Sequence, residues 1–486
     1  FAEAAELYSD YWSRYPNSQR RAEAAYLAAY AYYRAGDFVK SAAAAEATGA
    51  IVAGSRYHAD LLRLLANLER RNGRPEIALQ RIDELIQLLP NDLYAQIDRM
   101  KLAFDMGDHA SLTDYADQLR TSFPDLMDRD PKTDAVATYL QGVSEIALKR
   151  YRKGIELLRR PGLQRELRGE LANLATDADY WLGWALYRVG EFGDAAGLLE
   201  SSESDDDALF LAGWAHYSGE RFEEAVLRFD DLAQRASTNL ASRARYMHAK
   251  SLRNLGRVAE AQDSYREVWE HYPTDGVADD ALFEYAETAS EAGDTELAVR
   301  AFEILIDRYL DSPLRAEALF RSAEALFEEG DYSRSKDGFF NYRQEYPNGE
   351  SVPAALYWGG LAAERSGERF AAVFMWSNLI DRFPKSTFHP EALNLRAEAY
   401  AKDGDYSAAL ASLDELLTRH PEQAKALGTE DRAAEVRLLI AGLTGKEAEL
   451  AAAVARLGRE KTVAGRQEML KLARLYVLDQ KSPQER

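Results

Sequence analysis

A turn signal returns at a constant interval along the second half of the chain. A glycine followed by a charged residue recurs every 37 residues, as from Gly256 to Gly293. The pairs are Gly219-Glu220, Gly256-Arg257, Gly293-Asp294, Gly330-Asp331, Gly367-Glu368 and Gly404-Asp405. A fixed period is typical of repeat proteins, in which one unit buries its apolar face only by stacking on the next. At 486 residues the chain is also too long for one compact core, so a repeat array is expected.

Each period has the pattern of two amphipathic helices. In residues 277–310 the apolar side chains recur at helical spacing, namely Leu282, Phe283, Tyr285, Ala286 and Ala289, then Ala298, Phe302, Leu305 and Ile306. Between them, Gly293 suits the left-handed end of a helix and Asp294 suits the cap of the next. The second helix of the last five periods closes on an aromatic or His, followed by Pro or Leu: Tyr272-Pro273, Tyr309-Leu310, Tyr346-Pro347, Phe383-Pro384 and His420-Pro421. Proline cannot continue a helix, so it fixes where the next unit begins.

The pattern is looser towards the N-terminus. Turn signals there have variable spacing and lie at Gly36, Gly73, Gly107, Lys149-Arg150-Tyr151 and Gly190. We therefore expect repeats over 1–124, beginning inside a repeat that Tyr15-Pro16 closes, and irregular or inserted repeats over 125–205, where Pro131 and Pro161-Gly162 interrupt the helices. A regular array is expected over 206–421 and a helical cap over 422–486, since terminal repeats are usually atypical.

The repeat resembles the tetratricopeptide repeat (TPR). The matching residues are Leu182-Gly183, Gly190 and Ala195, then Gly360, Gly367, Ala372, Trp376 and Pro384, then Ala397, Tyr400, Gly404, Ala409 and Pro421. Small residues recur where facing helices must approach closely, at Ala249, Ala286, Ala323, Gly360 and Ala397. The resemblance implies an all-α fold, with helix-turn-helix repeats stacked into a right-handed superhelical solenoid. It also implies a function in binding other proteins. The period of 37 exceeds the roughly 34 residues of the usual repeat.

The extra residues follow the proline, as in Pro347-Asn348-Gly349-Glu350-Ser351. Such linkers, found also at Pro16-Asn17-Ser18 and Pro384-Lys385-Ser386, are similar to those of bacterial envelope TPR proteins such as the BamD and TolA-binding protein families. That resemblance implies a docking platform in the periplasm or at the outer membrane, often held by a lipid anchor. We expect a signal peptide or lipid-anchor segment, if there is one, to precede Phe1.

Net charge limits the classes of partner that we expect, and cysteine content favours one cellular location over another. The formal net charge of −21 disfavours nucleic acid and an anionic membrane surface, and leaves protein or peptide segments as the expected partners. The absence of cysteine favours an extracytoplasmic location, with a cytosolic protein from a cysteine-poor proteome as the alternative. No apolar run approaches the roughly 20 residues of a membrane span. Oligomeric state is left open.

Catalytic, cofactor and metal sites are not expected. The seven histidines form no zinc-protease motif, and a chain without cysteine has no thiolate ligand or cysteine nucleophile. Asp205-Asp206-Asp207 directly precedes an apolar run, so it is better explained as the acidic start of a helix than as a cation site. We therefore expect a protein that is not an enzyme.

The concave face of a TPR solenoid is lined by the first helix of each repeat, and the resemblance places the candidate binding residues there. They are Tyr26, Tyr30, Tyr33, Tyr180, Trp184, Tyr187, Arg243, Tyr246, Lys250, Arg253, Phe283, Glu287, Phe320, Glu324, Phe327 and Tyr357. Aromatic side chains are enriched at protein interfaces. The alternative is that these rings only pack between helices. The basic stripe Arg243, Lys250 and Arg253 either holds a partner carboxylate or pairs with nearby acids.

The expected function is thus a scaffold or adaptor of the bacterial envelope. Two alternatives stay open: a cytosolic TPR co-chaperone or regulator, and a structural spacer that holds no ligand in its groove.

Overall fold

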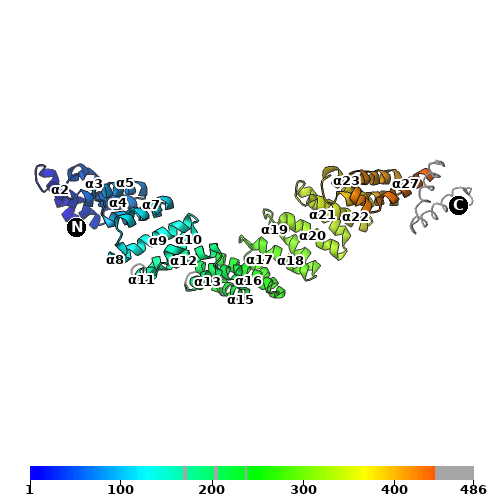
Figure 1. Ribbon diagram of the computed structural model, residues 1–486, viewed down its shortest axis with the longest axis horizontal. Coiled ribbons are helices and arrows are strands. Elements are labelled where there is room, and N and C mark those ends of the chain that lie inside the picture. The colour runs from blue at the N-terminus through cyan, green and yellow to red at the C-terminus, as the bar shows by residue number, and fades with distance from the viewer. Residues whose placement is uncertain (168–171, 202–205, 236–237, 444–486) are drawn as a thin grey trace, which may run out of the picture. The chain divides into compact units, whose positions relative to one another are not determined.

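The computed structural model describes residues 1–167, 172–201, 206–235 and 238–443, and all regular secondary structure in these ranges is α-helical (Figure 1). The chain divides into two compact units, Phe1–Ala236 and Ser237–Arg486. Consecutive helices pack as antiparallel pairs within each unit, which confirms the all-α solenoid of TPR-type repeats. The division falls inside the stretch 206–421 that we expected to be one regular array.

Unit 1 contains helices of unequal length. They are α1 (Ala2–Arg14), α2 (Arg21–Arg34), α3 (Phe38–Val52), α4 (His58–Arg71), α5 (Pro75–Leu88), α6 (Leu93–Asp105), α7 (His109–Ser122), α8 (Leu126–Arg129), α9 (Pro131–Ala147), α10 (Tyr151–Leu158), α11 (Leu163–Glu166), α12 (Ala172–Val189), α13 (Phe192–Leu199), α14 (Asp206–Ser218) and α15 (Phe222–Arg235). The long helices α9 and α12, of 17 and 18 residues, pair with α10 and α13, of only 8 residues each.

Unit 2 is more regular. It contains α16 (Thr238–Asn254), α17 (Val258–His271), α18 (Ala278–Glu291), α19 (Thr295–Arg308), α20 (Arg315–Glu329), α21 (Tyr332–Glu345), α22 (Val352–Arg365), α23 (Arg369–Arg382), α24 (His389–Lys402), α25 (Tyr406–Arg419), α26 (Pro421–Ala426) and α27 (Thr429–Leu443). The helices from α17 to α25 have 14 residues, apart from α20 with 15. Of the expected cap over 422–486, residues 444–486 lie outside the described residues.

The predicted turn, with a left-handed glycine and a capping aspartate, is confirmed at Gly293-Asp294. Gly293 has a φ of +78°, and the Asp294 side chain accepts a hydrogen bond from the backbone N–H of Leu297 at 3.1 Å. The predicted pair Gly219-Glu220 is different, because the left-handed residue there is Glu220, with a φ of +58°. Gly219 instead lies in a tight space, since a Cβ on it would lie 3.1 Å from the carbonyl oxygen of Ala215 and 3.2 Å from the Cβ of Phe192. The left-handed residues of the α14–α15 and α16–α17 turns, Glu220 and Gly256, are therefore 36 residues apart.

Close approach of paired helices depends on the row of small residues in unit 2. Ala249, Ala286 and Ala323 are fully buried, and Ala397 nearly so. At Gly360 an added Cβ would lie 2.3 Å from the Nε1 atom of Trp376 in the partner helix. The backbone of α22 can therefore lie directly against the indole of α23. The Trp376 N–H donates to the carbonyl oxygen of Tyr357 at 3.3 Å.

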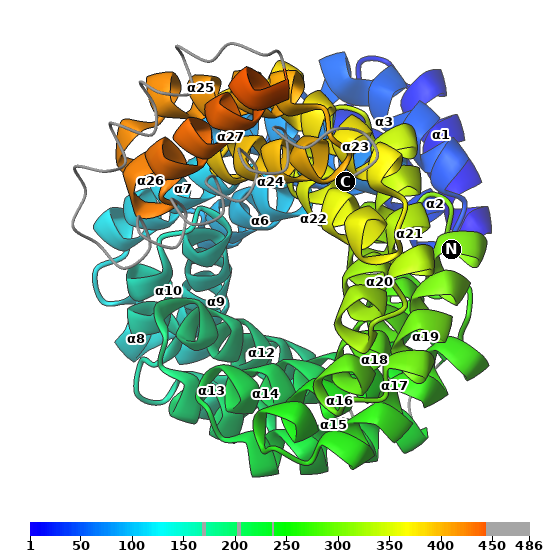
Figure 2. The same cartoon turned by 90° about the vertical axis from the view of Figure 1, so that its right-hand side faces the viewer.

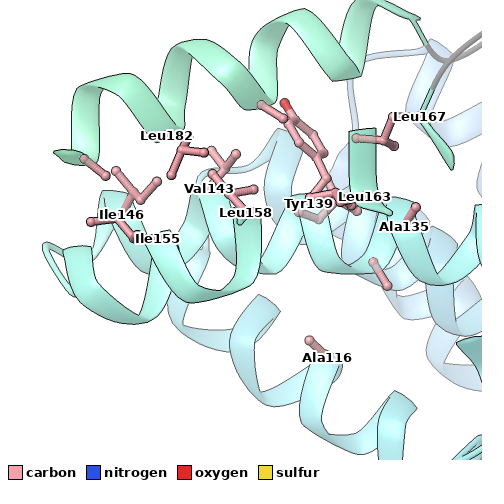
Figure 3. Packing of buried hydrophobic residues seen from close by; sticks show 14 of the residues in the cluster. Ala116, Ala135, Tyr139, Val143, Ile146, Ile155, Leu158, Leu163, Leu167 and Leu182 are labelled. Atoms are coloured by element: carbon pink, nitrogen blue, oxygen red, sulfur yellow. The ribbon is translucent and has the colours of Figure 1, made fainter. Parts of the chain in front are cut away.

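The core of unit 1 is centred on α9. Figure 3 shows Tyr139, Val143 and Ile146 of this helix packed with Leu158 of α10 and Leu182 of α12. One side of α9 is polar where it meets its neighbours. Asp134 is almost fully buried there and forms salt bridges with Arg120 of α7, at 3.1 Å, and with Arg160 after α10.

These salt bridges link α9 to α7 and to the segment after α10, next to the Pro161-Gly162 break. They lie where α10 is too short to pack along the whole length of α9. No helix among the described residues is both long and apolar enough to cross a membrane.

We predict that Ala286→Glu destabilises unit 2 by several kcal/mol, because it both overpacks a fully closed helix contact and buries a charge. Ala259→Glu is the matched control, since Ala259 is exposed on α17, and it should change stability by less than about 0.5 kcal/mol. Urea unfolding followed by circular dichroism measures both effects. Equal midpoints for the two variants would contradict the packing described here.

Candidate functional site

The first helices of the repeats lie side by side on the inner side of unit 2. Figure 2 shows α16, α18, α20, α22 and α24 on this side, and α17, α19, α21 and α25 outside them. Each first helix packs its buried stripe on its own second helix and on the preceding one. The opposite stripe is half-buried or exposed, and we call the set of these stripes the inner face.

The predicted aromatic row does not lie on the inner face as free rings. Three rings lie against a ring of the second helix of their own repeat: Tyr246 against Tyr265 at 5.9 Å, Phe283 against Phe302 at 5.5 Å and Phe320 against Phe339 at 5.3 Å between centroids. Tyr357 instead stacks on Phe388, just before the next first helix, at 4.8 Å. Phe320 and Tyr357 are only 9% and 8% exposed. The rings fill the space between paired helices, so Phe320 and Tyr357 cannot be the main binding anchors that the repeat register predicted. Tyr246 and Phe283 are half-buried.

The predicted basic stripe is largely neutralised by the next repeat. Arg253 on α16 forms salt bridges with Glu284 and, at 2.5 Å, with Glu291 on α18. Lys250 lies 3.7 Å from the Glu284 carboxylate and 5.5 Å from the centre of the Tyr246 ring. Arg243 is exposed at the start of this stripe. Of the two explanations offered for Lys250 and Arg253, pairing with nearby acids is the one observed.

An acidic row crosses α18 and α20, and sequence reasoning found only two of its members, Glu287 and Glu324. The row consists of Asp280, Glu284, Glu287 and Glu291 on α18, and Glu317, Glu324 and Glu328 on α20. The 37-residue register could have revealed it, because residues 280 and 317, 287 and 324, and 291 and 328 are all acidic.

Arg321 is the base within this row. It reaches Glu317 at 2.9 Å, Glu324 at 2.8 Å and Glu287 at 3.9 Å.

Two carboxyls of the row are poorly compensated. Burial raises the pKa of Glu287, and the opposing attraction of Arg321 and Arg253 does not cancel this effect. Burial also raises the pKa of Asp280, with a further contribution from the negative charge of Asp279. Both charges therefore oppose folding at neutral pH. Costly charges of this kind concentrate where a protein binds something.

Apolar side chains continue the inner face beyond the acidic row. Trp358 and Leu361 on α22 and Leu395 on α24 are half-buried there. Trp358 packs edge-on against Phe327, at 5.2 Å between ring centres, and Arg365 lies 4.8 Å from the centre of the Phe327 ring. Phe327 is thus half-buried in a contact between two repeats. The inner face changes from basic on α16 to acidic on α18 and α20, and then to apolar on α22.

The candidate residues of unit 1 are half-buried tyrosines and a tryptophan that stack on one another. Tyr26 stacks on Tyr30 at 5.9 Å, and Tyr33 meets Phe38 edge-on at 5.5 Å. Burial and the nearby Asp60 raise the pKa of Tyr26 to about 12. Other candidate residues lie together on α12, where Trp184 stacks on Tyr187 at 6.1 Å and Tyr180 is half-buried beside them.

The described residues contain no group of three side chains able to hold a metal ion. Asp206 lies in the first turn of α14 and forms a 3.3 Å salt bridge with Arg235, whereas Asp205 lies outside the described residues. The closest pair of histidines is His389 and His420, whose ring nitrogens are 2.9 Å apart.

Comparison with known families identifies the repeats. Residues 275–395 match the YfiO family, described as outer membrane lipoprotein. Residues 243–275 and 391–422 match one tetratricopeptide repeat family, and residues 182–241 match another. These regions include α16, α18, α20 and α22. A search of curated protein sequences found no significant match.

Solved structures with stacked helix pairs are similar to the chain at low identity. The C-terminal part of a TPR repeat-containing protein from Cytophaga hutchinsonii is 16% identical, over 51% of this chain and 98% of that one, with a TM-score of 0.41. The Naa15/Naa10 complex bound to HypK-THB is 15% identical, over 93% and 70%, with a TM-score of 0.37. The apo form of RapI is 10% identical, over 68% and 98%, with a TM-score of 0.40.

We predict that Asp280→Asn and Glu287→Gln each raise the Tm at pH 7, by roughly 1–3 °C for a unit of this size. The folded-state pKa of each carboxyl lies above its ordinary value, so the folded protein takes up the proton first as the pH falls. Wild type therefore regains the lost stability at acidic pH, and the advantage of the variants should disappear there. Glu328→Gln, at an exposed position of α20, is the control. A lower Tm for both variants at pH 7 would contradict the conclusion that the charges of Asp280 and Glu287 oppose folding.

Proposed function

Because the chain is a tetratricopeptide-repeat protein whose residues 275–395 match an outer membrane lipoprotein family, we propose that it is a non-catalytic scaffold of the bacterial envelope. Its proposed ligand is a segment of another protein, bound along the inner face of unit 2. The observation that carries this proposal is the acidic row of α18 and α20, where carboxylates are retained although burial makes them costly.

The chemistry of the inner face indicates what the segment contains. Basic side chains of a partner would neutralise Asp280 and Glu287 and remove the penalty that these charges impose on the free protein. An apolar side chain further along the same segment would cover Trp358 and Leu361 on α22. An extended or helical segment with a basic part followed by an apolar part therefore fits α18 to α22. Electrostatic attraction would also speed the encounter, because the whole chain is acidic.

The proposed location is the periplasm or the periplasmic side of the outer membrane. It is supported by the family match at 275–395, by the linkers after the prolines and by the absence of cysteine. A cytosolic co-chaperone would use the same inner face, so location is a separate claim with its own test.

The inner face can be tested by crosslinking and affinity capture with a Glu287→Gln, Glu324→Gln double variant. These substitutions keep the shape of the side chains and remove two charges of the acidic row. We expect a specific partner to be lost or reduced at least tenfold, since interface hot spots contribute about 2 kcal/mol or more. The matched control is Glu270→Gln, Glu296→Gln, two exposed positions on the outer helices α17 and α19. An unchanged set of partners from the folded double variant would move the interaction away from the inner face.

Location can be tested by fractionating cells that express the full-length gene. We expect the protein to be recovered with periplasmic or outer-membrane markers after processing of its precursor. Recovery only with cytosolic markers, without processing, would favour the co-chaperone alternative.

A further inference from the structure

The outer helices of unit 2 share one register, so equivalent positions can be compared between repeats. The helices α17, α19, α21, α23 and α25 begin at residues 258, 295, 332, 369 and 406, each 37 after the last. Two outward positions are polar or small in four of these helices and Phe in α23. The first comprises Ala259, Glu296, Ser333, Phe370 and Ser407, and the second comprises Asp263, Arg300, Asp337, Phe374 and Ala411. Phe370 is 88% exposed and Phe374 is 44% exposed.

The preceding outer helix, α21, also departs from the residue pattern that the other outer helices share. At one position the outer helices carry Trp269, Ile306, Ile380 and Leu417, but α21 carries Arg343. A turn earlier, Phe340 occupies a position that is Arg266, Glu303, Ser377 or Asp414 elsewhere. Thus α21 places a cation where its neighbours place an apolar side chain, and both helices place rings where their neighbours are mostly polar.

Three of these exceptions, Phe340, Arg343 and Phe374, meet in space. The Arg343 guanidinium carbon lies 5.0 Å from the centre of the Phe340 ring and 5.5 Å from that of Phe374. Its Nε atom is buried and has no hydrogen-bond partner in the described part of the chain. Burial lowers the pKa of Arg343, and the nearby positive charge of Arg382 lowers it further. We call Phe340, Arg343, Phe370, Phe374 and Arg382 the Phe–Arg patch.

The patch has no internal counter-ion. Among the residues that the structure describes, no salt bridge to Arg343 or Arg382 is formed. Three carboxylates nearby in sequence are already paired, Glu345 with Arg315 and both Asp337 and Glu368 with Lys336. Arg382 donates one hydrogen bond to the carbonyl oxygen of Pro347 at 3.1 Å. The Arg343 guanidinium therefore lies beside the exposed ring of Phe374, with the positive charge of Arg382 nearby, in a protein that otherwise has an excess of acids.

We propose that the Phe–Arg patch is a second docking surface, which binds an acidic segment of another protein that also carries an aromatic or large apolar side chain. A partner carboxylate would accept hydrogen bonds from Arg343 and Arg382 and neutralise the two positive charges. The partner's apolar side chain would cover Phe370 and Phe374, which are exposed to water in the free protein. An anionic bilayer is disfavoured as the occupant, because the rest of the chain would be repelled by it.

This surface and the inner face differ in location and in charge. The inner face is suited to a basic segment, whereas the Phe–Arg patch is suited to an acidic one. The two proposals share no residue, so either can fail without the other.

The test uses the full chain and a fluorescent 12-residue peptide containing one Trp flanked by Asp and Glu, beside a twin with Lys in place of each acid. Fluorescence anisotropy should give at least tenfold tighter binding of the acidic peptide. Phe370→Glu and Arg343→Met should each weaken this binding at least tenfold. Both variants should fold, since Glu296 occupies the position of Phe370 in α19 and the other outer helices carry an apolar residue at the position of Arg343. Ser333→Ala and Ser407→Ala, at the position equivalent to Phe370, are the controls and should bind as wild type does.

Three results would overturn the proposal. The first is equal binding of the acidic and basic peptides, or binding unchanged in both patch variants. The second is binding of phosphatidylglycerol–phosphatidylethanolamine vesicles, lost in Phe370→Glu, without binding of the acidic peptide. The third is concentration-dependent self-association, measured by light scattering and abolished by Phe370→Glu, which would make the patch an interface between two copies of this chain.

Discussion

The distance at which the two helices of a repeat meet is the constraint on which unit 2 depends. Small side chains set this distance: a Cβ on Gly338 of α21 would lie only 2.8 Å from the Cβ of Ala323 on α20. At that separation a ring on the first helix reaches a ring on the second, as Phe320 reaches Phe339. The ring pairs take up much of the apolar surface, so polar side chains are left for the outward stripes.

The division between packing and polar stripes explains why the fold could be predicted well from the sequence. Turns at Gly293-Asp294 and its equivalents depend on local chemistry, namely a left-handed glycine and a side-chain cap, and both are visible in a dipeptide. Glu220 shows the limit of this local signal, because a glycine next to the turn does not identify the residue with positive φ. At that turn Gly219 lies close to Phe192, on a helix of the preceding repeat, and Glu220 has the positive φ.

The candidate site was less predictable, for a tertiary reason. Helical spacing places Phe320 on one face of its helix, but whether the ring is buried depends on Phe339 and Tyr342 across the turn. Likewise, Arg253 forms its salt bridges with Glu284 and Glu291 on the next first helix, and helical spacing does not predict such contacts between helices. The departures at Arg343 and Phe370 become visible only when the outward positions of the second helices are compared between repeats.

Ion pairs between successive first helices make the inner side of unit 2 sensitive to salt. Arg253 with Glu291, Arg321 with Glu287, and Lys402 with Glu364 each join one first helix to its neighbour. Partly exposed pairs weaken as ions screen them, whereas ring packing inside a repeat hardly responds to salt. The links between repeats along this edge are therefore softer than the repeats that they join. Because dissolved ions screen these pairs, the stiffness of unit 2 is expected to fall as the ionic strength rises.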